Sequence, residues 1–315
     1  MSSSIIASLC SALSRAGIHA STDAVLRDFT TFRLGGRCLC LATCRTPAQL
    51  QAAVRAVAAA GMESVLIGGG SNLLISDRGL EAVVLRYVDE SVRVRQGGDV
   101  LEVEASMSLD ELARYTAEEG LAGLVYCSGI PGTVGGAIAG NAGAFGKQLG
   151  DHVVSVRVLD RRGDFRDVDG SELEFAYRSS RLLGSGEVVV SARLRMECGS
   201  ADALEKERSE ILGLRSEKHP DWRIQPTAGS FFKNIEPTSA ADRRQAAGWF
   251  LDQVGAKSMK VGGARVFEKH ANIIVADAGC KAQDVLDLSR QMAAAVKAKF
   301  GFDLTPEVRV LGSFG

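Results

Sequence analysis

The sequence predicts an α+β protein, because strand hairpins and amphipathic helices follow one another irregularly along the chain. Two pairs of alternating segments flank glycine turns, at Gly97-Gly98-Asp99 and at Arg162-Gly163-Asp164, as is typical of β-hairpins. Helical periodicity appears between them and after them. A doubly wound parallel sheet needs regular strand–helix repeats, so the pattern favours the α+β class.

The first part of the chain is expected to contain two helices and two strands. The helix at residues 4–16 lacks the basic start and cleavage signature of a signal peptide. An apolar strand follows at residues 38–41. Thr46 is placed to cap a helix that begins at Pro47 and stops at Gly61. A short buried strand at residues 64–67 comes next.

The later elements are expected from the same signals. Ser108 and Glu111 have the spacing of a capping box, which predicts a helix that runs towards Gly120. The two hairpins are expected at residues 91–95 with 100–105, and at 153–159 with 165–168. Helices are expected at 242–254 and 282–300, and short strands at 273–275 and 308–311. Joints between domains are expected near residues 76–79 and 212–226, where charged residues or prolines interrupt the pattern.

Composition excludes several classes of function. The 38 acidic and 37 basic residues give a net charge of −1 and form no basic tract, so neither nucleic acid nor an anionic membrane is an expected partner. No apolar run reaches the ~18 residues of a membrane span, and we expect a cytoplasmic protein. The cluster Cys38, Cys40 and Cys44 suggests a metal site, but alternation in an apolar strand favours small buried side chains. We expect no metal.

Two glycine-rich segments, residues 68–72 and 129–146, are the candidate ligand loops. Neither matches a standard phosphate motif, because Leu73 stands where a Rossmann fingerprint needs glycine and Asn141 where a P-loop needs one. Backbone N–H groups can nevertheless hold a diphosphate without a lysine. Taken alone, such loops are weak evidence of a ligand, because glycine turns in a β-rich fold would explain about half of these features.

Both loops resemble those of one flavoprotein family. Residues 66–74 are similar to the first FAD-diphosphate loop of the vanillyl-alcohol-oxidase type, and residues 128–146 to the second loop of the UDP-N-acetylenolpyruvoylglucosamine reductase family within that type. The resemblance continues in order through five further segments, Tyr177-Arg178-Ser179-Ser180, Arg215-Ser216-Glu217-Lys218, Gly229-Ser230-Phe231-Phe232-Lys233-Asn234, Lys269-His270-Ala271-Asn272 and Pro306-Glu307-Val308-Arg309. It covers most of the chain, from Thr31 to Gly312.

The resemblance implies two FAD-binding subdomains, at residues 1–76 and 77–212, and an α+β substrate-binding domain at 213–315. It implies NADPH-dependent, FAD-mediated reduction of UDP-N-acetylglucosamine enolpyruvate to UDP-N-acetylmuramate, a peptidoglycan precursor. The FAD should be non-covalent, since no histidine falls in either loop, and held chiefly by backbone N–H groups of residues 68–72 and 128–136. We expect a monomer of the shorter family subtype, which lacks a tyrosine-bearing insertion.

The family's functional residues map onto matching positions here. The implied FAD contacts are Gly68, Gly69, Gly70, Ser71, Asn72, Leu73, Ser128, Gly129, Ile130, Pro131, Gly132, Thr133, Gly135, Gly136, Asn141, Ala142, Gly143 and Arg215. The implied substrate contacts are Tyr177, Lys218, Asn234 and His270.

Three residues match the family's catalytic set. Arg178 and Glu307 match the pair at the substrate carboxylate, and Ser230 matches the proton donor. A guanidinium suits a planar carboxylate, and protonation of carbon needs a positioned acid. Without the resemblance, Arg178 and Ser230 would be ordinary turn residues, and Lys218 part of a solvated helix face.

Two other functions remain open at this point. One is a sugar or alcohol oxidase on the same FAD scaffold, and the other is a non-catalytic flavin- or nucleotide-binding relative. The sequence also departs from the family pattern at Ile235, where proline usually follows the asparagine, and at Phe267, where a small or polar residue is common. Both departures put the local loop geometry in doubt.

Overall fold

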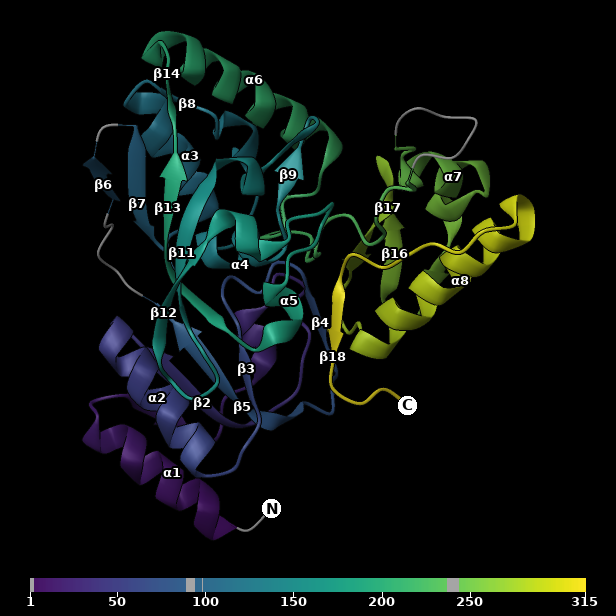
Figure 1. Ribbon diagram of the computed structural model, residues 1–315. Coiled ribbons are helices and arrows are strands. Elements are labelled where there is room, and N and C mark those ends of the chain that lie inside the picture. Colours follow the sequence, from purple (N-terminus) through teal and green to yellow (C-terminus); the bar gives the residue numbers. More distant parts are fainter. Residues whose placement is uncertain (1–2, 89–93, 98, 237–243) are drawn as a thin grey trace. The chain divides into compact units, whose positions relative to one another are not determined.

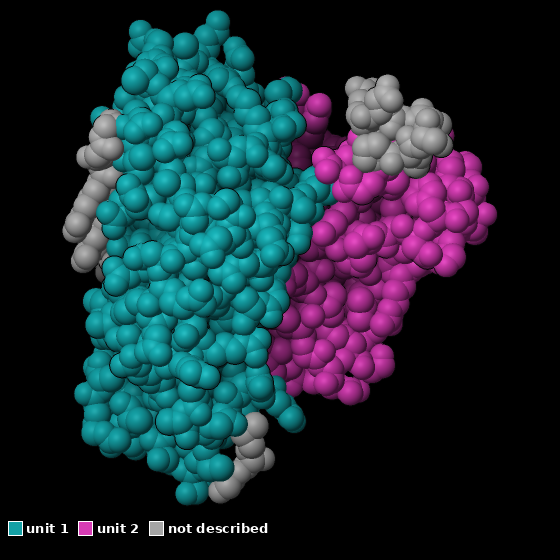
Figure 2. Space-filling model, viewed as in Figure 1, with its two compact units in different colours: residues 1–24, 38–69, 81–214 teal, residues 25–37, 70–80, 215–315 magenta. Residues whose placement is uncertain are grey.

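The computed structural model describes residues 3–88, 94–97, 99–236 and 244–315 (Figure 1). The chain forms two compact units, which Figure 2 colours separately. Unit 1 comprises Met1–Ala24, Cys38–Gly69 and Glu81–Leu214, and unit 2 comprises Val25–Arg37, Gly70–Leu80 and Arg215–Gly315. Antiparallel sheets and helices occur in both units, which confirms the α+β class. The finer division at residues 76 and 212 stays a prediction.

The first sheet of unit 1 has four strands in the order β1-β2-β5-β3. These are β1 (His19–Ser21), β2 (Cys38–Cys44), β5 (Leu80–Tyr87) and β3 (Ser64–Leu66). Helices α1 (Ser3–Arg15) and α2 (Pro47–Ala59) contact each other and β2 (Figure 1). The predicted cap of α2 is present, since Thr46 Oγ1 accepts the Gln49 N–H at 3.2 Å.

The cysteines of β2 are packing residues. Cys38, Cys40 and Cys44 are all buried in this strand. Burial raises the pKa of Cys44 to about 12, which keeps its thiol protonated at neutral pH. The described part of the chain contains no group of three or more side chains placed to hold a metal ion.

The second sheet of unit 1 has five antiparallel strands in the order β12-β11-β13-β7-β6. These are β12 (Phe165–Asp169), β11 (Val153–Leu159), β13 (Val188–Arg195), β7 (Val100–Glu104) and β6 (Val94–Gly97). Both predicted hairpins are present, as the pairs β11–β12 and β6–β7. Residues 91–93 of the first predicted strand and Gly98 of its turn lie outside the described residues.

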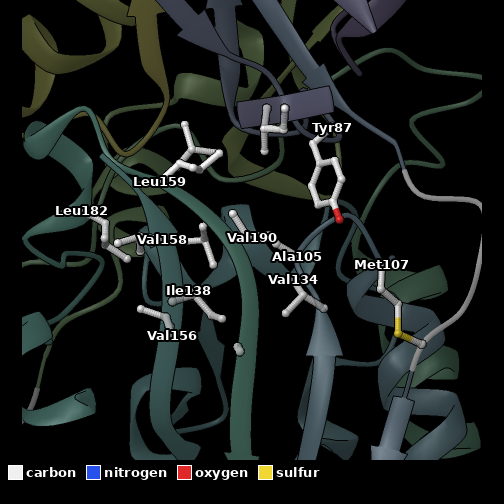
Figure 3. Close-up of a cluster of buried hydrophobic side chains, with 14 of the residues drawn as sticks. Tyr87, Ala105, Met107, Val134, Ile138, Val156, Val158, Leu159, Leu182 and Val190 are labelled. Carbon is white, nitrogen blue, oxygen red and sulfur yellow. The ribbon is translucent and has the colours of Figure 1, made fainter. Parts of the chain in front are cut away.

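The core of unit 1 fixes the start of the second glycine segment. Val134 and Ile138 of α4 (Val134–Ala139) are fully buried beside Val156 and Val158 of β11 and Val190 of β13 (Figure 3). Since α4 begins within this segment, its packing against the sheet holds the preceding loop in place.

The remaining elements of unit 1 are short strand pairs, helices and 3-10 turns. Ser108 Oγ accepts the Glu111 N–H at 3.4 Å, so the serine's half of the predicted capping box is present at the start of α3. These elements are α3 (Leu109–Glu118), β8 (Leu121–Ala122), η2 (Val125–Cys127), β9 (Gly143–Ala144), β10 (Lys147–Gln148), η3 (Leu149–His152), η4 (Gly170–Leu173), α5 (Leu182–Ser185), β14 (Glu197–Cys198) and α6 (Ala201–Lys218), whose end belongs to unit 2.

Unit 2 is built on a three-stranded antiparallel sheet, β15 (Lys260–Val261), β16 (Ala264–Phe267) and β17 (His270–Ala276). Helix α8 (Ala282–Phe300) contacts all three strands. Val285, Leu288, Met292 and Val296 of α8 are fully buried, at the three- and four-residue spacing of a helix face. Separately, β18 (Arg309–Leu311) pairs in parallel with β4 (Leu73–Ile75). The unit also contains η1 (Leu26–Phe29), α7 (Ala247–Gln253) and η5 (Ala256–Ser258).

The helix expected at residues 242–254 begins later than predicted. Helix α7 starts at Ala247, and residues 242–243 lie outside the described ranges. Gln245 exchanges two backbone hydrogen bonds with Ile235, at 2.9 and 3.0 Å. Ala246 is also extended, with φ −66° and ψ 120°. This pairing with a distant residue holds the segment extended, so the helix cannot begin before it ends. None of the helices in the described ranges is long and apolar enough to cross a bilayer.

Candidate active site

The two glycine-rich loops meet within unit 1 by direct backbone contact. A Cβ atom on Gly69 would lie 2.7 Å from the Cα of Gly132, and one on Gly68 would lie 2.5 Å from Thr133 Oγ1. Both distances are too short for a side chain. Glycine at positions 68 and 69 is therefore required by the approach of the loops, although neither residue has a positive φ.

Most N–H groups of the second loop are used inside the protein. Ser128 and Ile130 donate to backbone carbonyls at 3.0 Å, and Gly135 donates to the carbonyl of Ala105 at 2.8 Å. Gly129 donates to the carboxylate of Asp110 at 2.8 Å. These N–H groups are already used to shape the loop. Fewer N–H groups of residues 128–136 are therefore left to bind FAD than the sequence predicted.

The N–H groups left for a ligand gather where the loops touch. No described residue accepts a hydrogen bond from the N–H of Gly68, Gly69, Gly132 or Thr133. A surface of backbone donors with no room for side chains fits a diphosphate. The residues present thus fit the diphosphate group of FAD.

Arg178 is fixed by the second loop of the same unit. Its Nη2 donates to the Gly143 carbonyl at 2.6 Å, and its guanidinium carbon lies 5.2 Å from the centre of the Tyr177 ring. A Cβ on Gly143 would lie 3.2 Å from Nη1 and still closer to the Lys147 carbonyl, so only glycine fits there. The guanidinium is therefore held in one place rather than left mobile at the surface.

Asn141 ties the loop to the turn that carries Arg178. This fully buried side chain donates to the Ala176 carbonyl at 2.8 Å and accepts the Gly150 N–H at 2.9 Å. Both Asn141 and Arg178 have positive φ, at 45° and 53°. Such conformations are unfavourable for L-residues and tend to persist at functional sites. We therefore interpret Asn141 as a positioning residue for Arg178.

Unit 2 places Ser230 and Glu307 next to each other. The N–H of Glu307 donates to the carbonyl of Phe231 at 2.8 Å, which joins segments more than seventy residues apart in the sequence. The carbonyl of Glu307 accepts the Asn72 side-chain amide at 3.1 Å. Asn272 holds the other side of Phe231, since its backbone carbonyl accepts the Phe231 N–H at 2.8 Å. Both predicted catalytic side chains of this unit are half-buried.

A pocket of about 390 Å³ opens beside Ser230. Asn234 and His270, both predicted substrate contacts, also line it, together with Trp249, Lys257 and Lys269. Lys257 is paired with Asp252 at 2.9 Å, whereas Lys269 forms no ion pair with a described residue. A pocket with a hydroxyl, an amide and cationic groups fits an anionic, polar ligand such as a nucleotide diphosphate.

Two histidines form a pair in this unit. The rings of His219 and His270 lie 5.5 Å apart, and His270 Nδ1 accepts the Asn272 N–H at 3.2 Å. Burial lowers the pKa of His219 to about 4, with further lowering by the positive charges of His270 and Arg215. Burial likewise lowers the pKa of His270. Both rings are therefore neutral at pH 7.

The predicted site residues divide between the units. Tyr177 and Arg178 belong to unit 1, with the second loop. Unit 2 contains the other predicted catalytic and substrate residues, which are Ser230, Glu307, Asn234, His270, Lys218 and Arg215. The FAD segment at 68–73 is split, since the boundary falls after Gly69.

Several pocket residues escaped the sequence analysis. Trp249 and Lys257 lie in segments with no chemical motif, and Asp252 belongs to an ordinary helix pattern. Lys269 had a local signal, because it adjoins the predicted substrate residue His270 in the sequence. Tertiary folding, not spacing, brings this set to one pocket.

The two departures from the family pattern have local explanations. Ile235 forms the backbone pairing with Gln245 that precedes α7. Asn234 Oδ1 then accepts the N–H of Ala247 at the start of that helix, at 3.2 Å. Phe267 is buried against Ile273 and Val275, so an apolar residue belongs there.

Comparison with known proteins identifies the family. Residues 220–311 match the model of the UDP-N-acetylenolpyruvoylglucosamine reductase C-terminal domain, and residues 38–169 match an FAD binding domain. The UDP-N-acetylenolpyruvoylglucosamine reductase of Heliobacterium modesticaldum is 37% identical over 286 residues, which cover 91% of this chain and 88% of that protein. That of Solibacter usitatus is 34% identical over 94% of this chain and 97% of its own.

A solved structure agrees with these sequence relatives. The crystal structure of UDP-N-acetylenolpyruvylglucosamine reductase from Thermus caldophilus superposes with a TM-score of 0.77 at 30% identity, and covers 94% of this chain and 99% of that chain. The similarity thus extends over both the FAD-binding and the C-terminal parts. The chain belongs to the UDP-N-acetylenolpyruvoylglucosamine reductase family.

Proposed function

We propose that this protein catalyses the NADPH-dependent reduction of UDP-N-acetylglucosamine enolpyruvate to UDP-N-acetylmuramate. The net change adds a hydride to the β-carbon and a proton to the α-carbon of the enolpyruvyl group. When bound, FAD supplies the hydride-transfer chemistry, with NADPH as the source of the hydride. The protein must then bind the substrate carboxylate, stabilise the charge that develops on it, and deliver the proton.

The observation that carries this proposal is the junction of Ser230 with Glu307. The hydrogen bond between the Glu307 N–H and the Phe231 carbonyl holds the residue with the carboxyl group beside the backbone segment that carries the Ser230 hydroxyl. Ser230 itself lines a pocket that also contains Lys257 and Lys269. A hydroxyl that serves as a proton donor to carbon needs fixed polar neighbours, because it is a weak acid in water. We assign Ser230 as the proton donor to the α-carbon.

Arg178 and Glu307 are proposed to bind the enolpyruvyl carboxylate. The Arg178 guanidinium is held by Gly143 and Tyr177, so its fork needs little reorganisation to meet a planar carboxylate. A protonated Glu307 would add a hydrogen bond to the enolate-like state. Preorganised donors of this kind stabilise developing charge without a rearrangement at the moment of reaction.

The diphosphate of the substrate is proposed to lie at the cationic pocket of unit 2. Lys218, Asn234 and His270 are its proposed contacts, to which the structure leads us to add Lys269. Lys218 and Lys269 are exposed, and neither pairs with a described carboxylate, so both charges are available to phosphate. The FAD diphosphate is proposed to bind at Gly68, Gly69, Gly132 and Thr133.

Three assays test the proposal together. Acid treatment of the purified yellow protein should release free FAD. NADPH beyond the one equivalent that reduces the bound FAD should then be consumed when UDP-N-acetylglucosamine enolpyruvate is present, with a product heavier by two hydrogens. Oxidation of simple sugars or alcohols by O₂, without any reaction of the enolpyruvyl substrate, would favour an oxidase instead.

The wider role follows from this reaction. UDP-N-acetylmuramate is a precursor of peptidoglycan, so we place the protein in cytoplasmic cell-wall biogenesis, on which cell shape and division depend. We also propose that it acts as a monomer. Light scattering of the FAD-loaded protein near its sequence mass of 33.3 kDa would support a monomer, and twice that mass would contradict it.

A further inference from the structure

The hairpin of β9 and β10 has an unusual residue at its tip. Ala144 pairs with Lys147, so Phe145 and Gly146 form a two-residue turn. Their φ angles are 52° and 78°, and positive φ at both central positions is typical of a type I′ turn. Asn-Gly is the favoured sequence for such a turn, and a phenylalanine in its first position is conformationally unfavourable.

Packing within the protein does not compensate for this conformation. The Phe145 side chain is 61% exposed, whereas the neighbouring Ala142 and Ala144 pack against the core of unit 1. Phe145 also makes no ring contact with another described aromatic residue. An exposed aromatic ring on a strained backbone has no evident role in folding.

The same hairpin holds the guanidinium that is proposed to bind the substrate carboxylate. Gly143 lies two residues before Phe145, and its carbonyl accepts Arg178 Nη2 at 2.6 Å. The described chain has five non-glycine residues with positive φ, and Asn141, Phe145 and Arg178 are three of them. Strained residues gather where a site requires a particular side chain in a particular place.

We propose that Phe145 is a specificity residue that packs its ring against the N-acetylglucosamine ring of the substrate. This inference rests on the proposed function. The enolpyruvyl group is joined to the sugar through a single ether oxygen, so the sugar is the part of the substrate next to an Arg178-bound carboxylate. Two residues of chain span at most about 7 Å, which keeps Phe145 close to that position. The C–H face of a sugar ring is apolar and suits an exposed aromatic side chain.

The test separates the fold from the contact. Phe145→Asn supplies the residue that the turn prefers, so the FAD-loaded variant should melt about 2–4 °C higher than the wild type. Its KM for UDP-N-acetylglucosamine enolpyruvate should rise about tenfold, corresponding to the loss of a modest contact. Phe145→Tyr keeps the ring and should restore a near-normal KM.

Two further measurements locate the contact on the ligand. Inhibition by UDP, which lacks the sugar, should be equally strong in wild type and Phe145→Asn. Reduction of bound FAD by NADPH should also proceed at the same rate in both. Weaker inhibition by UDP would place the ring at the uridine, and slower reduction would place it at the nicotinamide; either result would overturn the sugar assignment.

A matched control uses Glu174, an exposed residue of the same unit with φ 49°. Glu174→Asn relieves similar backbone strain and should leave the KM unchanged. An unchanged KM in Phe145→Asn would overturn the proposed contact with the sugar. A lower melting temperature would overturn the premise that Phe145 is unfavourable in the turn. If the wild type itself does not reduce the enolpyruvyl substrate, the proposed function fails, independently of the comparison between variants.

Discussion

Substitution of Gly69 by alanine tests the contact between the two glycine loops. An added Cβ would lie 2.7 Å from Gly132 Cα, and the atom it meets is backbone, which cannot rotate away. One of the loops must shift. Overpacking of this kind costs about 1–3 kcal/mol, which corresponds to a melting temperature lower by about 2–10 °C.

The shift would also separate the backbone donors of the site. Gly68 and Gly69 would move relative to Gly132 and Thr133, so the purified Gly69→Ala protein should contain little FAD. The ratio of flavin to protein absorbance measures this content, and thermal melting of FAD-free protein measures the strain. Gly184→Ala is the matched control, because a Cβ there meets no atom within 4 Å and the residue also belongs to unit 1.

Two results would refute this reasoning. Gly69→Ala with the FAD content and melting temperature of Gly184→Ala would mean that the loops do not need their close approach. Loss of FAD with unchanged melting of the FAD-free protein would mean that the added methyl group meets the cofactor, not Gly132. Backbone strain plays no part in this expectation, since Gly69 does not have a positive φ.

Three other predictions concern the site. Asn141→Ala removes the hydrogen-bond partner of the Ala176 carbonyl and of the Gly150 N–H in a buried setting. The free energy of unfolding, measured with urea, should fall by about 2–5 kcal/mol, and kcat, measured by steady-state turnover, should also fall. Lys218→Ala should raise the substrate KM with little change in kcat, because a phosphate contact remote from the reacting carbons stabilises ground and transition states alike; an equal fall in kcat would contradict that placement. His219 has a folded pKa of about 4, below the ordinary value of 6.5. The stability that its neutral ring contributes is therefore complete above pH 6.5 and is lost as the pH falls towards 4. Between pH 7 and about pH 4.5, His219→Gln should lose about 2 kcal/mol less stability than the wild type, and identical shifts of the urea midpoint in both proteins would contradict the assignment.

Local sequence signals predicted much of the fold. Helix α8 has the predicted bounds, because its apolar period is continuous and Gly301 ends it with φ 82°. Strand β11 also matches its predicted range, since it alternates cleanly before a glycine turn. The predicted start of helix α7 was wrong because the contact that delays the helix is not local in the sequence. Ile235 pairs with Gln245, and neither residue lies in a sequence pattern that indicates the pairing.

The candidate site shows the same division. Motifs indicated Arg178 and Ser230 and the two loops, since each lies in a short recognisable segment. Sequence spacing did not predict Lys257 or Trp249 as site residues, because only tertiary folding brings them to the pocket beside Ser230. Nor did the sequence reveal that the Gly129 N–H donates to Asp110, because this hydrogen bond joins the loop to helix α3, nineteen residues earlier in the chain.

The role of Ser230 is tested most directly by following the two half-reactions of one variant. Stopped-flow absorbance of the flavin should show that Ser230→Ala is reduced by NADPH nearly as fast as the wild type. Reoxidation by UDP-N-acetylglucosamine enolpyruvate should be slower by ~10²–10⁴-fold, the usual loss when a general acid is removed. Equal slowing of both half-reactions would mean that Ser230 is structural, and normal reoxidation would mean that another group donates the proton.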